Sequence, residues 1–197
     1  ILDPQVEQAF FASIKKRASG FPLAYILGYA DFMDLRLRIN DEVLIPRNDT
    51  EALVTSVLKF ANKDARNTCI DAGCGSGAIC CAIKHYCPNW HVLGMDLSQA
   101  ALNVSKANAH AHQLDIPLFR GNFLACIQSQ SIDIIVSNPP YIDPQSPYLK
   151  ADGLEFEPSQ ALIANENGLG DIKTLFQQAN MALKPKGLLF LEFGFDQ

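Results

Sequence analysis

The most informative stretch of this sequence is Asp71-Ala72-Gly73-Cys74-Gly75-Ser76-Gly77-Ala78. It follows a short apolar segment, Thr68-Cys69-Ile70, that predicts a β-strand, and it precedes a predicted helix that runs through roughly Tyr86. Glycines at this position let the backbone turn sharply and bring its N–H groups against a ligand, with the helix N-terminus behind them. The stretch also satisfies the G-x-G-x-x-G/A pattern, so by itself it leaves open whether the ligand is a nicotinamide nucleotide or another nucleotide-like cofactor, and a tight turn without a ligand is the plainer alternative.

Downstream of this loop the sequence alternates between predicted strands and predicted helices. The strands that we expect are His91–Met95, Leu118–Phe119, Ile132–Val136 and Leu188–Phe193. Helices are expected from a cap at Ser98 to about Gln113 and over Asp171–Leu183, after which Pro185-Lys186-Gly187 turns the chain into the last strand, an edge of the sheet. Such alternation predicts an α/β fold with a mostly parallel sheet and helices on both faces.

The residues before this alternation have a different pattern. Residues 1–20 predict an amphipathic helix, which we expect to be the end of a small helical domain. A β-hairpin follows, with one strand around Tyr29–Met33, a turn at Asp34 and a half-exposed strand over Leu35–Ile39. We therefore expect three parts: residues 1–27 from a helical domain, residues 28–47 as a hairpin linker, and residues 48–197 as the main domain.

The end of the hairpin linker reads Ile45-Pro46-Arg47-Asn48-Asp49-Thr50-Glu51. It predicts the start of a helix, with Asn48 or Asp49 as the N-cap, because short polar side chains at that position accept hydrogen bonds from the first free N–H groups.

Composition excludes several classes of protein. The 197 residues are 48% hydrophobic and 19% charged, which is typical of a soluble globular protein and excludes disordered and collagen-like chains. No apolar run reaches membrane-helix length, so we expect no membrane partner. The net charge of −5 gives no sign of a nucleic-acid partner.

The cysteines indicate neither a metal nor a redox motif. They are Cys69, Cys74, Cys80, Cys81, Cys87 and Cys126. No two of them form a Cys-x-x-Cys pair, so we expect no metal, and most lie in apolar segments where a free cysteine behaves as a small buried hydrophobic residue. Without a secretory leader at the start of the sequence, we expect a cytoplasmic protein.

Three residues after later strands are candidate cofactor ligands. Asp96 ends a strand 19 positions after Gly77, where a carboxylate can accept hydrogen bonds from both hydroxyls of a ribose, although a helix cap is the alternative. Asn122 and Phe123 follow the next strand and can bind the edge and the face of an adenine, although a lone aromatic residue is more often part of the core.

The tetrapeptide Asn138-Pro139-Pro140-Tyr141 directly follows the apolar strand Ile132–Val136. In an open α/β sheet ligands bind outside the carboxyl ends of the strands, which places this loop beside the glycine loop. Two prolines make it rigid and leave its carbonyls free to accept hydrogen bonds, Asn138 adds another acceptor and Tyr141 adds a flat wall. The alternative is an ordinary proline-rich turn.

Together, the glycine loop, Asp96 and the Asn-Pro-Pro-Tyr loop resemble a class I S-adenosylmethionine-dependent methyltransferase, with a Rossmann-like, mostly parallel sheet. Three further stretches resemble the HemK/PrmC family, the peptide chain release factor N5-glutamine methyltransferases. They are Leu44-Ile45-Pro46-Arg47-Asn48-Asp49-Thr50-Glu51, Ser137-Asn138-Pro139-Pro140-Tyr141-Ile142, and Phe156-Glu157-Pro158 with Ala161-Leu162. The sequence departs from the family at Asn122, often aspartate, and at Phe123, commonly tryptophan. The family's chains also have a longer N-terminal helical domain, and they continue past residue 197 with a helix and two more strands.

This resemblance implies a site and a reaction. The implied binding residues for S-adenosylmethionine, and for its product S-adenosylhomocysteine, are Asp71, Gly73, Cys74, Gly75, Ser76, Gly77, Asp96, Leu97, Asn122, Phe123 and Asn138. The implied catalytic and substrate-binding residues are Asn138, Pro139, Pro140 and Tyr141. In this scheme the Asn138 oxygen and the Pro139 carbonyl accept the two amide protons of the substrate, while Pro140 shapes the pocket and Tyr141 packs on the amide.

The implied substrate is the glutamine of a Gly-Gly-Gln tripeptide in a class 1 release factor, recognised in part by the N-terminal helix and hairpin of a monomeric enzyme. Three alternatives remain at this point. One is an adenine N6-methyltransferase acting on DNA or RNA, which would need a basic groove. Another is a ribosomal-protein glutamine methyltransferase, a family that lacks the Asp-Thr-Glu found here after Pro46-Arg47. The third is a nicotinamide-binding module or a non-catalytic scaffold protein.

Overall fold

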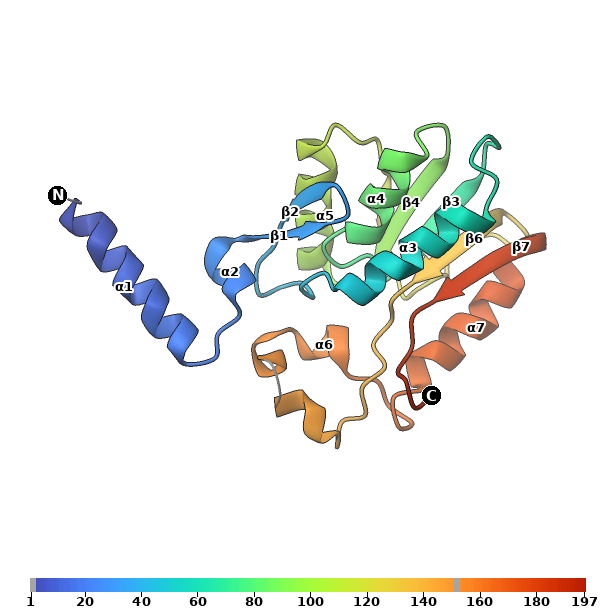
Figure 1. Ribbon diagram of the computed structural model, residues 1–197. Helices are drawn as coiled ribbons and strands as arrows, with labels where there is room; N and C mark the ends of the chain where they lie inside the picture. Colours follow the sequence, from blue (N-terminus) through green and yellow to red (C-terminus); the bar gives the residue numbers. More distant parts are fainter. Residues whose placement is uncertain (1–2, 151–152) are drawn as a thin grey trace.

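The computed structural model describes residues 3–150 and 153–197 (Figure 1). Its helices are α1 (Pro4–Ala18), α2 (Leu23–Leu27), α3 (Asn48–Phe60), α4 (Ala78–Tyr86), α5 (Gln99–Ala111), α6 (Ser159–Leu162) and α7 (Gly170–Ala182), with short 3-10 turns η1 (Pro147–Lys150) and η2 (Leu154–Phe156). Its strands are β1 (Tyr29–Phe32), β2 (Leu35–Arg38), β3 (Thr68–Ala72), β4 (His91–Asp96), β5 (Leu118–Arg120), β6 (Ile132–Ser137) and β7 (Leu183–Leu191).

Five of these strands form one parallel sheet in the order β5-β4-β3-β6-β7. This confirms the predicted α/β fold. Within the sheet the chain first forms the central strand β3, then β4 and β5 on one side of it, and then β6 and β7 on the other. The crevice where the strand order reverses, between the carboxyl ends of β3 and β6, is where such sheets bind ligands.

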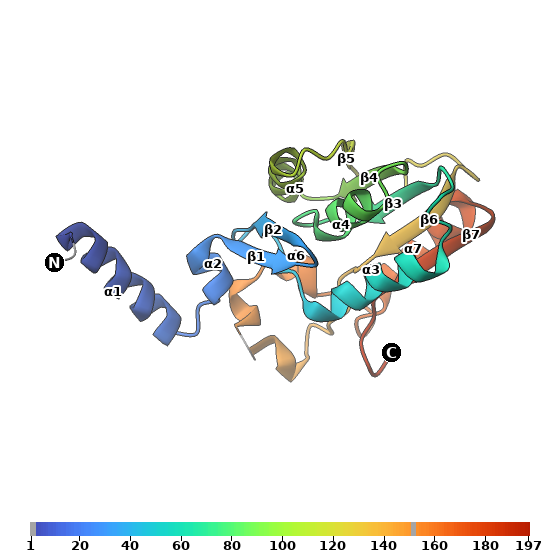
Figure 2. The same ribbon diagram turned by 45° about the horizontal axis from the view of Figure 1, so that its top comes forward.

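Helices cover both faces of the sheet, with α3, α4 and α5 on one face and α7 on the other (Figure 2). Neighbouring strand residues point to opposite sides: Cys69 of β3 packs with the α3–α5 face, whereas Ile70 packs with α7. In β6 the consecutive residues Ile134, Ile135 and Val136 are all buried, because both of its faces are covered.

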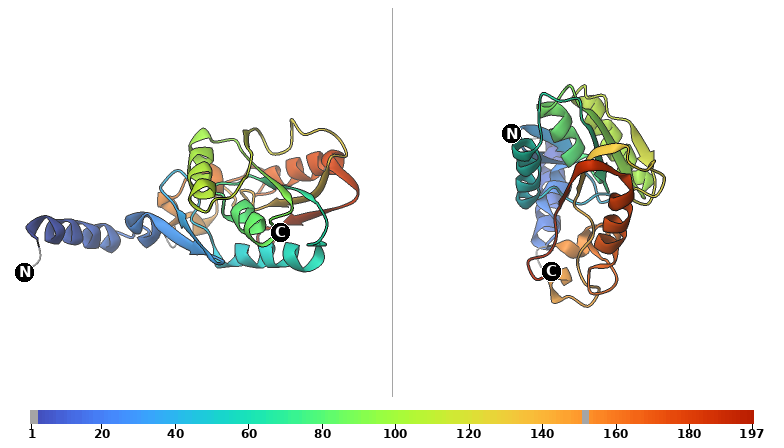
Figure 3. Two further views of the ribbon diagram at one scale, coloured as in Figure 1. Left: turned by 90° about the horizontal axis from the view of Figure 1, so that it is seen from above. Right: turned by 90° about the vertical axis from the view of Figure 1, so that its right-hand side faces the viewer.

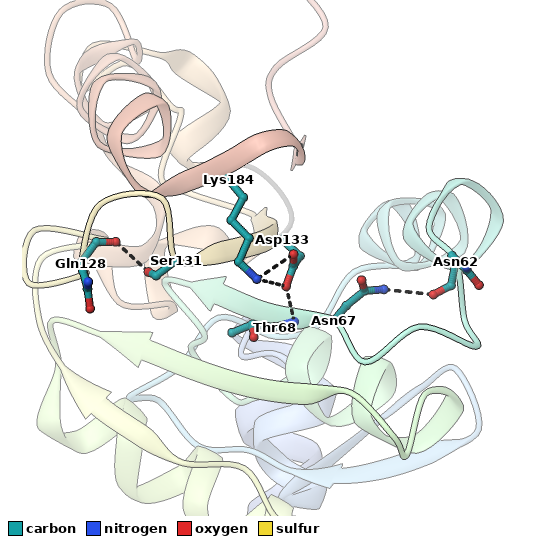
Figure 4. A network of polar contacts seen from close by, with 7 residues as sticks. All are labelled: Asn62, Asn67, Thr68, Gln128, Ser131, Asp133 and Lys184. Carbon is teal, nitrogen blue, oxygen red and sulfur yellow. Dashed lines mark hydrogen bonds and ion pairs between the residues drawn. The ribbon is translucent and has the colours of Figure 1, made fainter.

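The amino ends of three neighbouring strands are held by one carboxylate, far from the ends that carry the ligand loops (Figure 4). Asp133 of β6 accepts hydrogen bonds from the Thr68 amide at 2.8 Å and from the Lys184 ammonium at 2.8 and 2.9 Å. Burial raises the pKa of Asp133, but these two partners outweigh it and hold that pKa below its usual value. The cluster anchors β3, β6 and β7 to one another.

The hairpin of β1 and β2 packs onto the main domain. Leu35 and Leu37 are buried and Arg36 and Arg38 are exposed, as the alternation predicted. The side chain of Asn108 in α5 bonds both the N–H and the C=O of Arg38, at 2.8 and 2.9 Å. These bonds, with the apolar contacts of Leu35 and Leu37, make the hairpin part of the core formed by α3, α4 and α5.

The N-terminal helix α1 extends away from the rest of the molecule (Figures 1 and 3). It begins at an Asp3 cap and is amphipathic as predicted. Its apolar residues Val6, Phe10, Phe11 and Ile14 are all about half exposed.

Two local predictions about helix and strand boundaries were wrong. The N-cap of α3 is Arg47 and not Asn48 or Asp49, and no side chain caps this helix. The backbone of Arg47 is extended and its guanidinium pairs with Glu157, and the helix begins directly after it.

The other error concerns the last strand. Pro185-Lys186-Gly187 is not a turn before the strand but lies within β7, which already pairs with Ile132 at its first residue, Leu183. The irregularity appears instead as a register shift, with Lys186 at a φ of 69°.

Candidate active site

A cavity of about 230 Å³ opens at the carboxyl ends of the parallel strands. The predicted residues that line it are Gly73, Cys74, Gly75, Ser76, Asp96, Leu97, Asn122, Phe123, Asn138 and Pro140. They come from the ends of β3, β4, β5 and β6, so the fold gathers onto one surface residues from four separate parts of the chain.

The glycine loop between β3 and α4 is held by the neighbouring strand. The N–H groups of Gly73 and Cys74 both donate to the Met95 carbonyl at 2.8 Å. Gly77 has a φ of 82°, and a Cβ at that position would lie 2.4 Å from the Ser105 hydroxyl oxygen. Only glycine therefore lets the loop pack this closely against α5.

Asp96 lies at the end of β4 and contacts the glycine loop. One of its carboxylate oxygens accepts from the Gly75 N–H and the other from the Ser98 N–H, each at 2.8 Å. Burial raises the pKa of Asp96, while these backbone hydrogen bonds oppose that rise. Each oxygen retains a further lone pair, so the carboxylate can still accept two ligand hydroxyls.

Leu97 and Phe123 supply apolar walls for the same cavity. The Leu97 side chain is 49% exposed although it is large and hydrophobic, and Phe123 has a φ of 47°. The Phe123 ring lies 3.7 Å from where a Cβ on Gly73 would be, so the ring covers the glycine loop. Asn122 is exposed beside it.

Two of the predicted cofactor residues do not line the cavity. Asp71 is fully buried beneath the glycine loop, where one carboxylate oxygen accepts from the Cys80 N–H at 3.0 Å. The other oxygen has no hydrogen-bond partner in the described part of the chain. Burial raises the pKa of Asp71 to about 7. Asp71 and Gly77 thus support the loop without lining the cavity, whereas Gly73, Cys74, Gly75 and Ser76 line it.

A second cavity, of about 420 Å³, is also lined by residues of the Asn-Pro-Pro-Tyr loop. Pro139 and Tyr141 line it, together with Arg47 and Asp49. Asn138 lines both cavities, and so stands where they meet.

A hydrogen-bonded chain behind Asn138 was not expected from the sequence. The Asn138 side-chain N–H group donates to the Thr50 hydroxyl at 3.1 Å, and that hydroxyl donates to Glu192 at 2.8 Å. The Tyr141 hydroxyl donates to the other Glu192 oxygen at 3.1 Å. Burial and the adjacent Glu192 charge raise the pKa of Tyr141 to about 12, so it is protonated at neutral pH.

One signal in the sequence could have identified Glu192. It directly follows β7, as Asn138 follows β6, and the carboxyl ends of parallel strands carry ligand residues. Thr50 belongs to one of the family-like stretches, but its position in α3 gave it no role.

A buried ion pair joins the hairpin linker to the segment after the Asn-Pro-Pro-Tyr loop. Glu157 is 6% exposed and pairs with the Arg47 guanidinium, and its second oxygen accepts from the Ile45 N–H at 3.0 Å. This contact brings Pro158 and Ala161 over the first cavity.

All six cysteines are free, and all but Cys126 are buried. Within residues 3–150 and 153–197, no group of three or more His, Cys, Asp or Glu side chains could hold a metal ion. No helix in the same ranges has the length and apolar composition needed to cross a bilayer.

Comparisons with known proteins agree with this geometry. Residues 49–151 match the family model of the methyltransferase small domain. The chain is 40% identical over 192 residues to a release factor glutamine methyltransferase from Enterococcus faecalis, covering 97% of this chain and 69% of the relative. It is 40% identical to a protein of the same name from Moorella thermoacetica, covering 100% of this chain and 70% of the relative.

Solved structures share the fold at low sequence identity. The ribosomal protein L11 methylase from Lactobacillus delbrueckii superposes with a TM-score of 0.54 at 20% identity, covering 76% of this chain and 62% of that one. The hMettl16 catalytic domain, solved with an RNA hairpin, superposes with a TM-score of 0.58 at 19% identity, covering 80% and 60%. At such identities the likeness supports the fold alone.

Proposed function

This chain belongs to the release factor glutamine methyltransferase family, and we propose that it methylates the side-chain amide nitrogen (N5) of the glutamine in the Gly-Gly-Gln motif of a class 1 release factor. The methyl donor is S-adenosylmethionine, and the enzyme is a protein-glutamine methyltransferase. The observation that carries the proposal is the position of Asn138, which lines both the first cavity, with most of the predicted cofactor residues, and the second cavity.

The residues that line the first cavity suit S-adenosylmethionine, which would supply a methyl group on a positively charged sulfur when bound. Asp96 retains two free lone pairs for the ribose hydroxyls, and Leu97 and Phe123 present apolar surface for the adenine. Gly73 and Gly75 expose loop backbone in the same cavity, close to where the rest of the cofactor would lie.

The substrate amide would lie against the Asn-Pro-Pro-Tyr loop. An amide nitrogen is a weak nucleophile because its lone pair is delocalised into the carbonyl. Acceptors for both of its hydrogens orient it and increase its electron density as the new bond forms. We assign these acceptors to the side-chain oxygen of Asn138 and the carbonyl of Pro139, whose neighbours Pro140 and Tyr141 shape the pocket. No general base is needed before transfer, because the amide proton becomes acidic only after methylation.

A neutral acceptor set favours an uncharged amide over a phosphate backbone, in keeping with the net charge of −5. The family relationship likewise does not favour the adenine, ribosomal-protein or nicotinamide alternatives. The second cavity, with Arg47 and Asp49 at its wall, offers a donor and an acceptor for an extended peptide. The helix α1 and the hairpin remain the predicted second contact with the release factor, and a monomeric enzyme remains a prediction. Because the proposed substrate is a translation factor, we propose that the reaction takes place in the cytoplasm.

Replacing Asn138 by alanine tests this assignment. We expect kcat for folded release factor to fall about a hundredfold, as when one preorganised polar group is removed from an active site, while the Kd for S-adenosylmethionine changes far less. The matched control is Asn103→Ala, which removes an exposed asparagine on α5. Release factor with its target glutamine changed to alanine should receive no methyl group. Equal activity of Asn138→Ala and wild type would contradict the assignment, and labelled methyl on DNA or RNA with none on release factor would contradict the function.

A further inference from the structure

We infer that Glu192 determines which end of the Asn138 side-chain amide faces the substrate, and is thereby a positioning residue for the methyl-transfer site. The inference rests on the proposed function, because it concerns the acceptor that the target glutamine meets. A chain of hydrogen bonds runs from Glu192 through Thr50 to Asn138.

The direction of these bonds follows from what each group can donate. An ionised carboxylate only accepts, so the Thr50 hydroxyl must use its single hydrogen on Glu192, at 2.8 Å. The Thr50 oxygen can then act only as an acceptor towards Asn138, 3.1 Å away. Asn138 must therefore turn its NH2 group to Thr50, which leaves its oxygen for another partner.

The hydrogen on the Thr50 hydroxyl thus decides an orientation of the Asn138 amide that the shape of the side chain leaves open. The two ends of an asparagine amide have nearly the same size, so packing alone would allow either. The charge on Glu192 excludes one of them, because the reversed amide would set its oxygen against a Thr50 oxygen that has no hydrogen left to donate. Thr50 is only 4% exposed, so water offers it little alternative.

The same carboxylate also orients Tyr141, whose hydroxyl donates to the second oxygen of Glu192 at 3.1 Å. Asn138 and Tyr141, which flank the two prolines, are thus both oriented by the Glu192 carboxylate at the end of β7, Asn138 through Thr50 and Tyr141 directly. The neighbouring strands β6 and β7 are paired up to Ser137 and Leu191, so their following residues, Asn138 and Glu192, are held in register.

The predicted consequence is selectivity for glutamine over glutamate. An amide NH2 meets the Asn138 oxygen favourably, whereas a carboxylate at the same place sets oxygen against oxygen. Reversing the Asn138 amide would reverse this preference, because its NH2 group would then face the substrate.

The decisive variant is Glu192→Gln, which keeps the size of the side chain but allows it to donate to Thr50. The Thr50 hydroxyl is then free to donate to Asn138, and the Asn138 amide can turn over. We expect kcat for release factor to fall about thirtyfold or more, while the Kd for S-adenosylmethionine stays within about threefold of wild type.

A second measurement distinguishes a reversed Asn138 amide from a general loss of activity. Release factor with its target glutamine changed to glutamate should inhibit Glu192→Gln at about a tenfold lower concentration than it inhibits wild type. Thr50→Val removes the hydroxyl that links Glu192 to Asn138 but gives the Asn138 oxygen no new donor. It should therefore lose turnover without becoming more sensitive to the glutamate form of the release factor. Glu166→Gln is the matched control. Glu166 is exposed and pairs with Lys173, outside the hydrogen-bonded series of Glu192, Thr50 and Asn138, so this variant should behave as wild type.

A third readout needs no substrate. The side-chain amide signals of Asn138, assigned by their loss in Asn138→Ala, should shift in the NMR spectrum of Glu192→Gln. Because this measurement uses no substrate, unchanged Asn138 signals would overturn the inference whatever the substrate of the protein is. Wild-type kcat in Glu192→Gln, or lost kcat without the gain in glutamate-form inhibition, would overturn it as well. Failure of wild type to methylate release factor would instead contradict the proposed function.

Discussion

Replacing Asp96 by alanine should weaken the binding of S-adenosylmethionine about ten- to hundredfold. Each carboxylate oxygen of Asp96 accepts one backbone N–H, from Gly75 or from Ser98, and has one further lone pair for a ribose hydroxyl. Two hydroxyls that lose a charged acceptor cost about 1.5–3 kcal/mol of binding free energy, which corresponds to that range of Kd. The Gly75 N–H loses its acceptor too, so the glycine loop is also held less firmly before the cofactor binds.

Isothermal titration with both S-adenosylmethionine and S-adenosylhomocysteine is the suitable assay. The two ligands share the ribose and differ in the charge on sulfur, so a ribose role predicts nearly equal losses for both. A loss confined to the positively charged ligand would indicate that Asp96 acts on the sulfonium instead. Asp171→Asn is the control, because Asp171 lines the same cavity and is also acidic. Unchanged affinity for both ligands in Asp96→Ala would refute the ribose role.

Three further predictions concern stability. The pKa of Asp71 is about 7 in the folded protein against a usual value of 3.8, so the unfolded chain loses this proton first as the pH rises. The protonated carboxyl therefore stabilises the folded protein fully below pH 3.8, and about 4 kcal/mol of the free energy of unfolding is lost by the time the pH has passed 7. Urea unfolding at pH 5 and pH 8 should show a smaller pH dependence for Asp71→Asn than for wild type. Gly77→Ala should lower the free energy of unfolding by about 2 kcal/mol, measured by urea unfolding, because the new Cβ would lie 2.4 Å from the Ser105 hydroxyl oxygen and 3.3 Å from its Cα. Arg47→Met should cost about 3 kcal/mol in the same assay, because it leaves the buried Glu157 carboxylate without its charged partner.

Controls for these predictions exist in the same chain. Gly28 has a φ of 76° but nothing lies within 4 Å of its added Cβ, so Gly28→Ala should cost less than Gly77→Ala. Arg36 and Asp31 form an exposed pair, so Arg36→Met should leave the unfolding midpoint unchanged. An equal effect of the two arginine variants would contradict the role of burial, and parallel pH profiles for Asp71→Asn and wild type would contradict the raised pKa.

The sequence by itself determined the architecture and most of the cofactor site. Strand and helix periodicities are local, so β3 to β6, most of β7 and the helices α4, α5 and α7 could be located without tertiary information, whereas the short helix α6 was not predicted. The position of a motif at the end of a parallel strand is also local, and the sheet brings all such ends to one edge. For that reason the glycine loop, Asp96, Phe123 and Asn138 were predicted together and line one cavity.

Tertiary structure alone decided which side of each motif faces a ligand and which distant groups support it. Asp71 belongs to the glycine motif, yet it turns into the core and not into the cavity. The bond from Thr50 to Glu192 joins residues 142 positions apart, and Asn108 reaches 70 positions back to the hairpin. No periodicity encodes such pairs, because their approach depends on how α3, β7 and α5 pack once the sheet has formed.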